Sequence, residues 1–80
     1  MKSATLKKLK EYRRQLRYIE YKLSAMRILC HMLYKITKNE RIGKVDLALQ
    51  YAVEHITIAI DHLSSVILEL EEWSREGGGE

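Results

Sequence analysis

The stretch LKEYRRQLRYIEYKLSAMRILCHML, residues 9–33, decides the fold of this chain. Its apolar residues recur at alternating intervals of three and four, which is the spacing of positions a and d in a heptad repeat. A β-strand would instead alternate apolar and polar residues at every second position. The stretch therefore predicts a long amphipathic helix, whose expected inward residues are Leu9, Tyr12, Leu16, Ile19, Leu23, Met26, Cys30 and Leu33.

A second stretch with the same period follows, and its expected inward residues are Leu49, Val53, Ile56, Ile60, Leu63, Ile67 and Leu70. The 80 residues contain no proline, so nothing forces a break within either stretch. We expect one domain, with helices at about 4–38 and 46–75, a connection at 39–45 and a flexible tail at 76–80. Asn39 or Gly43 is expected to end the first helix in the left-handed conformation, and Asp46 to cap the second.

A short connection makes neighbouring helices antiparallel, and each helix carries a second apolar stripe at positions c and g. These stripes fall on one side of the hairpin and consist of Tyr18, Ala25, Leu29, Met32 and Ile36, and of Ala48, Ala52, His55, Ala59, His62, Val66 and Trp73. A monomer rarely exposes more than a few hundred Å² of continuous apolar surface. The sequence therefore predicts an all-α antiparallel helical hairpin that dimerises about a two-fold axis into a four-helix bundle. The alternative is that this face covers a helix of a different protein.

The net charge of +3 is distributed unevenly along the chain. Residues 2–38 carry a net charge of +9, whereas residues 45–80 carry −7. In an antiparallel hairpin the basic start of the first helix lies beside the acidic end of the second, so each cluster compensates the other and its unfavourable helix dipole. Exposed pairs of this kind contribute about 0–1 kcal/mol each.

A stripe of basic residues on the outer side of the first helix is not explained by this pairing. It consists of Lys7, Lys10, Arg14 and Arg17, followed by Tyr21. We expect these residues to point to solvent, out of reach of the second helix. Such a stripe can contact phosphates and stack on a base, so nucleic acid is a candidate partner. A solvated helix surface is the alternative, and a membrane partner is not expected, because the opposite face is committed to packing.

Catalytic and metal-binding patterns are weak. The chain has no Gly-rich phosphate loop, no HExxH and no nucleophile elbow. Arg27 and His31 superficially resemble the Arg–His step of helical ribonucleases, but apolar Ile-Leu-Cys separates them. His55 and His62 lie roughly 10 Å apart along a helix, too far to chelate one ion directly. We expect no enzymatic activity, no metal, no cofactor, no small-molecule substrate and a cytoplasmic location.

Two heptad helices joined by a short connection that Asn39 and Gly43 punctuate resemble two families. One is the Rop-type plasmid regulators, and the other comprises small helical-hairpin proteins of crenarchaeal viruses. The resemblance implies a dimeric antiparallel bundle that binds RNA loop pairs in the first family or acts as an adaptor in the second. It also implies a nucleic-acid contact through Lys10, Arg14 and Arg17, with Tyr21 as the aromatic.

The expected function is that of a non-enzymatic homodimeric adaptor or regulator, from a virus, a plasmid or a thermophile. It would act through contacts with itself and with an unidentified protein partner. The alternative is a nucleic-acid-binding regulator, for RNA or DNA, that uses the basic outer stripe of the first helix.

Overall fold

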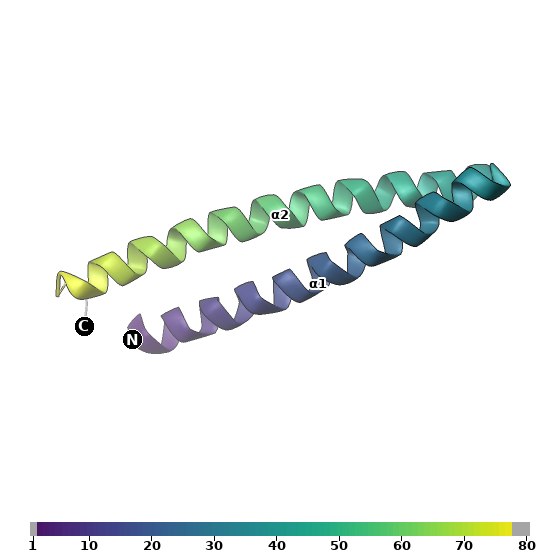
Figure 1. Cartoon of the computed structure of the whole chain (residues 1–80). Coiled ribbons are helices and arrows are strands. Elements are labelled where there is room, and N and C mark those ends of the chain that lie inside the picture. Colours follow the sequence, from purple (N-terminus) through teal and green to yellow (C-terminus); the bar gives the residue numbers. More distant parts are fainter. Residues whose placement is uncertain (1, 78–80) are drawn as a thin grey trace.

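The computed structural model describes residues 2–77, with side chains from residue 4 onward, and contains two long helices (Figure 1). Helix α1 spans Lys2–Thr37 and helix α2 spans Glu40–Arg75. The helices pack side by side in opposite directions, so both ends of the described chain lie at one end of a rod measuring 59 × 15 × 13 Å. This confirms the predicted all-helical hairpin.

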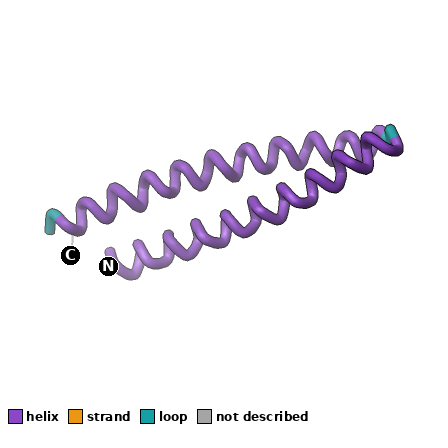
Figure 2. The backbone as a smooth tube through the Cα atoms, in the orientation of Figure 1, coloured by secondary structure: helices purple, strands orange, loops and turns teal. Residues whose placement is uncertain are grey.

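The connection is shorter than the sequence suggests, because only Lys38 and Asn39 separate the helices (Figure 2). The expected connection at 39–45 is wrong, since α2 begins at Glu40. Asn39 is the residue that starts it: its side-chain Oδ1 accepts hydrogen bonds from the amides of Arg41 at 2.9 Å and Ile42 at 3.3 Å. These bonds satisfy two of the amides that a helix leaves open at its N-terminus, so no later cap is needed.

The residue that reverses the chain is Lys38, not Asn39 or Gly43. Lys38 has a left-handed φ of 55°, and its amide donates to the carbonyl of Tyr34 at 2.7 Å. Gly43 lies inside α2, where a Cβ would stand 2.8 Å from the Tyr34 ring. The absence of a side chain at Gly43 therefore allows the Tyr34 ring of α1 to lie close to the α2 backbone. At the far end, Gly77 with φ 78° follows α2, and the predicted tail beyond it lies outside the described residues.

The left-handed Lys38 gives a first prediction. A left-handed conformation costs a residue with a Cβ roughly 1–2 kcal/mol, and glycine escapes that cost. We expect Lys38→Gly to be more stable than Lys38→Ala by about 1 kcal/mol in urea unfolding. Both variants lose the contact of the Lys38 ammonium with the Tyr34 ring, 5.9 Å from its centroid, so the comparison isolates the backbone. Equal stabilities would mean that Lys38 is not left-handed in solution.

The packed face of α2 follows the predicted stripe. Ile60 is 7% exposed and Ile67 only 1%, and the five other predicted residues of this stripe are half-buried. Each buried Ile or Leu side chain contributes about 1.5–3 kcal/mol. The a and d positions of α2 therefore form one side of the seam between the helices, as predicted.

The packed face of α1 is rotated from the predicted one. The predicted a residues are half-buried, namely Leu9, Leu16, Leu23 and Cys30. The predicted d residues are exposed instead, namely Tyr12, Ile19, Met26 and Leu33. Their place against α2 is taken by half-buried residues at position e, namely Leu6, Arg13, Glu20, Arg27 and Tyr34. The seam thus uses one edge of the apolar arc of α1, and the rest of that arc stays uncovered.

Four cross-helix pairs fix the register of the hairpin. They are Arg13 with Ser64, Glu20 with Thr57, His31 with Asp46, and Tyr34 with Gly43. The two residue numbers of each pair add up to 77, so every step down α1 is matched by an equal step up α2. Neither helix, within the residues described, has a stretch long and apolar enough to cross a bilayer.

Candidate interaction surface

One long side of the described hairpin carries exposed apolar side chains from both helices. We call it the uncovered face and define it by the exposed apolar residues at d, g and c of α1 and at g and c of α2. These are Ala4, Tyr12, Tyr18, Ile19, Ala25, Met26, Leu29, Met32, Leu33 and Ile36 on α1, and Val45, Ala48, Ala59, Val66 and Trp73 on α2, with half-buried Ala52 among them.

The predicted dimer-interface residues all belong to this side of the molecule. Of the twelve residues of the two predicted stripes, eleven are exposed and Ala52 is half-buried, and His55 and His62 lie among the apolar residues of α2. The sequence-based prediction missed the four d residues of α1, because it placed them in the seam. Their apolar character was visible, but periodicity alone did not indicate which edge of the stripe meets α2.

The opposite long side of the hairpin is polar, and its side chains join the two helices. The Arg13 guanidinium donates to the Ser64 hydroxyl at 3.4 Å, and the Thr57 hydroxyl donates to the Glu20 carboxylate. These side chains therefore reach across the seam between the helices. The polar side thus already carries side-chain contacts that join the two helices.

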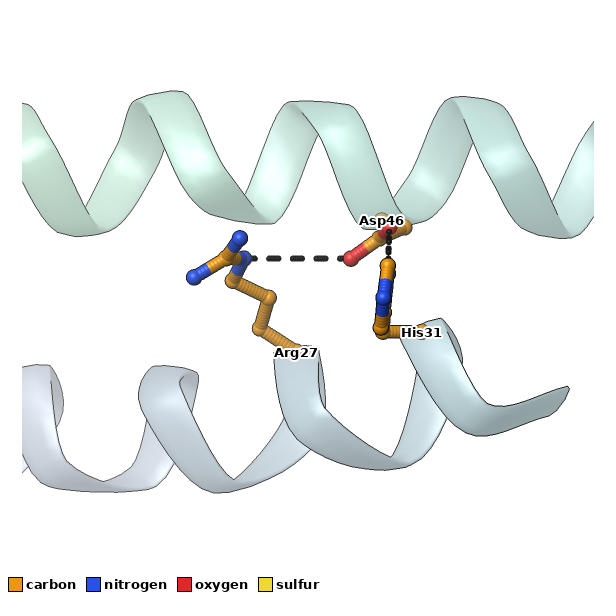
Figure 3. Close-up of polar contacts among 3 residues, drawn as sticks. All are labelled: Arg27, His31 and Asp46. Carbon is orange, nitrogen blue, oxygen red and sulfur yellow. Dashed lines mark hydrogen bonds and ion pairs between the residues drawn. The ribbon is translucent and has the colours of Figure 1, made fainter. Parts of the chain in front are cut away.

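The most enclosed of these polar contacts centres on Asp46, which was expected to cap α2. Its side chain is only 14% exposed and points from α2 toward Arg27 and His31 on α1 (Figure 3). One carboxylate oxygen lies 2.9 Å from Nδ1 of His31, and the other lies 3.8 Å from Nε of Arg27. At 3.8 Å the second contact is electrostatic, and neither of its two atoms has a hydrogen-bond partner in the described structure.

This cluster brings the Arg27–His31 step beside a carboxylate, which sequence reasoning did not foresee. Its geometry is that of an interhelical clasp near the connection, because one carboxylate bridges two basic side chains of the other helix. Between residues 2 and 77 no three His, Cys, Asp or Glu side chains gather as metal ligands would. Cys30 is a free, half-buried thiol in the seam.

The basic outer stripe is partly committed to carboxylates. Lys10 reaches α2 and pairs with Glu71 at 2.7 Å, which corrects the expectation that it points to solvent. Arg14 pairs with Glu11 one turn earlier, and their hydrogen bond and charges lower the pKa of Glu11 and raise that of Arg14. Lys7 and Arg17 are exposed, and so is Tyr21 on the same side.

The Lys10–Glu71 pair gives a prediction for acid stability. The hydrogen bond from Lys10 lowers the pKa of Glu71. Desolvation of the carboxylate acts in the opposite direction, and the positive charge of Lys10 lowers the pKa further. A folded-state pKa below the unfolded value of about 4.3 means that the stabilisation is present above that pH and is lost as pH falls through the folded value. We expect Glu71→Gln to lower the melting temperature near neutral pH and to narrow its difference from wild type on acidification below about pH 4.

The control for that prediction is Glu54→Gln, which changes an exposed glutamate for which the described structure gives no ion pair. It should leave both the neutral melting temperature and its acid dependence close to wild type. Thermal unfolding by circular dichroism, at one fixed protein concentration, measures both. A constant difference between Glu71→Gln and wild type across this pH range would show that the carboxylate charge is not involved.

Comparison with known proteins gives no further identification: no family model, no curated protein and no solved structure matches this chain.

Proposed function

We propose that the chain is a non-enzymatic, homodimeric helical-bundle protein that acts as an adaptor or regulator through protein–protein contacts. The observation that supports this is the uncovered face. Ile60 and Ile67 are the buried residues of the described hairpin, whereas large apolar side chains are exposed along its whole length. A hairpin with so small a core is marginal alone, and covering its apolar side with a second copy gives a four-helix bundle.

Coupling between folding and association tests this proposal. If the native state is a dimer and the unfolded state a monomer, the melting temperature depends on protein concentration. We expect it to rise steadily over a hundred-fold increase in concentration, followed by circular dichroism at 222 nm. A helical chain whose melting temperature stays constant over that range would be stable without a partner, and the proposal would fail.

Nucleic-acid binding is the second candidate, and the exposed side chains of Lys7, Arg17 and Tyr21 favour it. They lie on the side of α1 away from the uncovered face, so a dimer would leave them accessible. Because each phosphate contact releases counterions, affinity for a random RNA or DNA pool should fall steeply with salt. We expect a Lys7→Ala/Arg17→Ala variant to bind more weakly and with a shallower salt slope, by about one unit for each lost contact.

A matched control for the binding measurement is Lys35→Ala/Lys44→Ala, which removes the same net charge near the connection, far from the stripe. Equal binding by the two double variants would indicate nonspecific attraction to a basic protein and would remove this candidate. A pull-down with and without nuclease separates the two functions, because partners held by protein contacts remain after nuclease treatment and those held by nucleic acid are lost.

A further inference from the structure

The uncovered face is uneven along its length, and this unevenness constrains how a second copy can cover it. Toward the connection the face positions of α1 are all apolar, from Ala25 to Ile36. Toward the open end the same face carries Lys8, Gln15 and Lys22. Each end of the hairpin therefore offers a partner a different surface.

The two helices also differ in the size of the side chains they present. From the connection to the middle of the rod, α1 contributes large ones such as Ile19 and Met26, and α2 contributes small ones such as Ala52 and Ala59; the larger Val66 and Trp73 lie toward the open end. Large side chains pack best into the space above small ones, since protein interiors are close-packed. The best cover for α1 is thus a helix like α2, and the best cover for α2 is a helix like α1.

A two-fold axis allows two ways of stacking one uncovered face on another with antiparallel neighbours. An axis along the hairpin places both connections at the same end and lays α1 over the partner's α2. An axis across the hairpin places the connections at opposite ends and lays each helix over its own copy. In the first case symmetry fixes the register, because each residue of one copy lies level with the same residue of the other.

We propose that two copies of this chain associate through the uncovered face with both connections at the same end, so that α1 of each hairpin covers α2 of the other. The inference rests on the proposed dimer and adds its geometry. In this arrangement residues whose numbers add up to about 77 lie level across the interface. Large α1 residues then lie level with small or β-branched α2 residues of the partner in three successive layers: Ile19 with Ala59, Met26 with Ala52, and Leu33 with Val45.

Two basic residues of the face find polar counterparts in this arrangement, whereas Glu11 lies level with Val66 of the other copy. Lys8 lies level with Glu69 of the other copy, and Lys22 lies level with His55. More broadly, the basic half of α1 lies over the acidic half of the partner's α2 at the open end. These opposite charges repeat between hairpins the compensation that Lys10 and Glu71 provide within one.

The opposite-end arrangement matches the same surfaces poorly. It lays the apolar half of α1, residues 25–36, over the charged half of another α1, residues 4–15. Apolar side chains would then lie against Lys and Glu, whose burial costs free energy unless they are paired. It also stacks the small residues of α2 on one another, which leaves space between the backbones.

The size of the face suits a second copy. The hairpin is 59 Å long and about 15 Å wide, and a rectangle of those sides is close to the roughly 800 Å² per partner that stable interfaces bury. A shorter partner segment would leave part of the apolar length exposed.

Distances between spin labels test the arrangement. In a Cys30→Ala background, single cysteines are placed at Lys38 near the connection or at Ile58 near the middle of α2, and each is labelled for pulsed electron paramagnetic resonance. Both sites are exposed, so labelling leaves the seam intact. Because bundle helices lie 8–10 Å apart, the same-end dimer predicts a separation of about 20–35 Å between labels at 38. The opposite-end dimer predicts a separation approaching the 59 Å length of the hairpin.

The label at position 58 separates failure of the dimer from failure of the arrangement. Near the middle of the rod, both dimers give a short distance. A short distance at 58 with a long one at 38 would overturn the same-end arrangement and leave the dimer standing. No dipolar signal at either site would overturn both proposals.

A disulfide experiment gives an independent reading. Ile19→Cys and Ala59→Cys, each in the Cys30→Ala background, are mixed, refolded together and oxidised. The same-end dimer predicts a disulfide between the two different variants, since 19 and 59 lie level on facing helices. A disulfide formed only between two Ala59→Cys chains would contradict it, because that bond requires α2 to lie over α2.

Discussion

Leu29→Glu is expected to dissociate the protein into monomers and to reduce its helix content. Leu29 is 59% exposed in the single hairpin, so the substitution removes no contact within the chain that would explain such a loss. In the dimer it removes a buried leucine, worth about 1.5–3 kcal/mol, and leaves a carboxylate against apolar surface. Symmetry applies the change twice, so we expect a weakening of at least about 4 kcal/mol, or about a thousand-fold in Kd.

Leu68→Glu is the matched control, since Leu68 is 56% exposed and points away from the uncovered face. The control is also the harsher change electrostatically, because it adds a carboxylate beside Glu69 and Glu72. Light scattering after size exclusion should nevertheless report a dimer for Leu68→Glu and a monomer for Leu29→Glu, with helicity followed in parallel. If both variants behave alike, the uncovered face has no special role.

Ile67→Ala is expected to destabilise the protein by about 2–5 kcal/mol, the range for removing a buried Ile side chain down to Cβ. Ile67 is 1% exposed and lies in the seam, toward the open end of the hairpin. Small domains have total stabilities of only about 5–15 kcal/mol, so this single change should remove a large part of the stability. Urea unfolding at fixed protein concentration measures it.

Ile58→Ala removes the same atoms from α2 at a site that is 52% exposed, and it should cost less than about 1 kcal/mol. The contrast between the two variants tests the rotation of α2. Similar losses at 67 and 58 would mean that α2 presents a different face to α1 than the one described. A large loss at 67 with an unchanged dimer mass would confirm that the seam and the interface are separate surfaces.

The packed face of α2 could be predicted from sequence because its apolar residues form a narrow stripe. The positions beside this stripe hold mostly alanine and histidine on one side and polar residues on the other, so one orientation of the helix buries more large side chains than any other. The antiparallel hairpin followed from the absence of proline and the short break between two heptad patterns. These features are properties of one helix or one short segment, which is why local reasoning reached them.

The face of α1 could not be predicted in the same way, because its apolar arc covers positions a, d, g and c. That arc is wider than one neighbouring helix can bury. Which edge meets α2 depends on contacts across the seam, such as Arg13 with Ser64 and Glu20 with Thr57. Heptad reasoning assigns such polar residues to solvent. It therefore overlooked the contacts that turn the e positions of α1, in place of its d positions, toward α2.

The start of α2 was misplaced for a similar reason. Asp46 and Asn39 are equally good capping residues by type, and Gly43 between them is typical of a loop. The structure uses Asn39 as the cap and Gly43 for the approach of Tyr34, which releases Asp46 for the clasp with His31. Only the packing of α1 against α2 distinguishes these roles. The residue types of the connecting segment alone therefore do not show which residue caps α2.

The mass of the wild-type chain in solution is the most direct measurement of whether two hairpins cover each other's apolar side. Light scattering after size exclusion, repeated from low to high micromolar concentration, should give twice the chain mass of 9.4 kDa for a fully helical species. A fully helical species that remains at 9.4 kDa throughout that range would show that the uncovered face is stable in water, and the dimer would be ruled out.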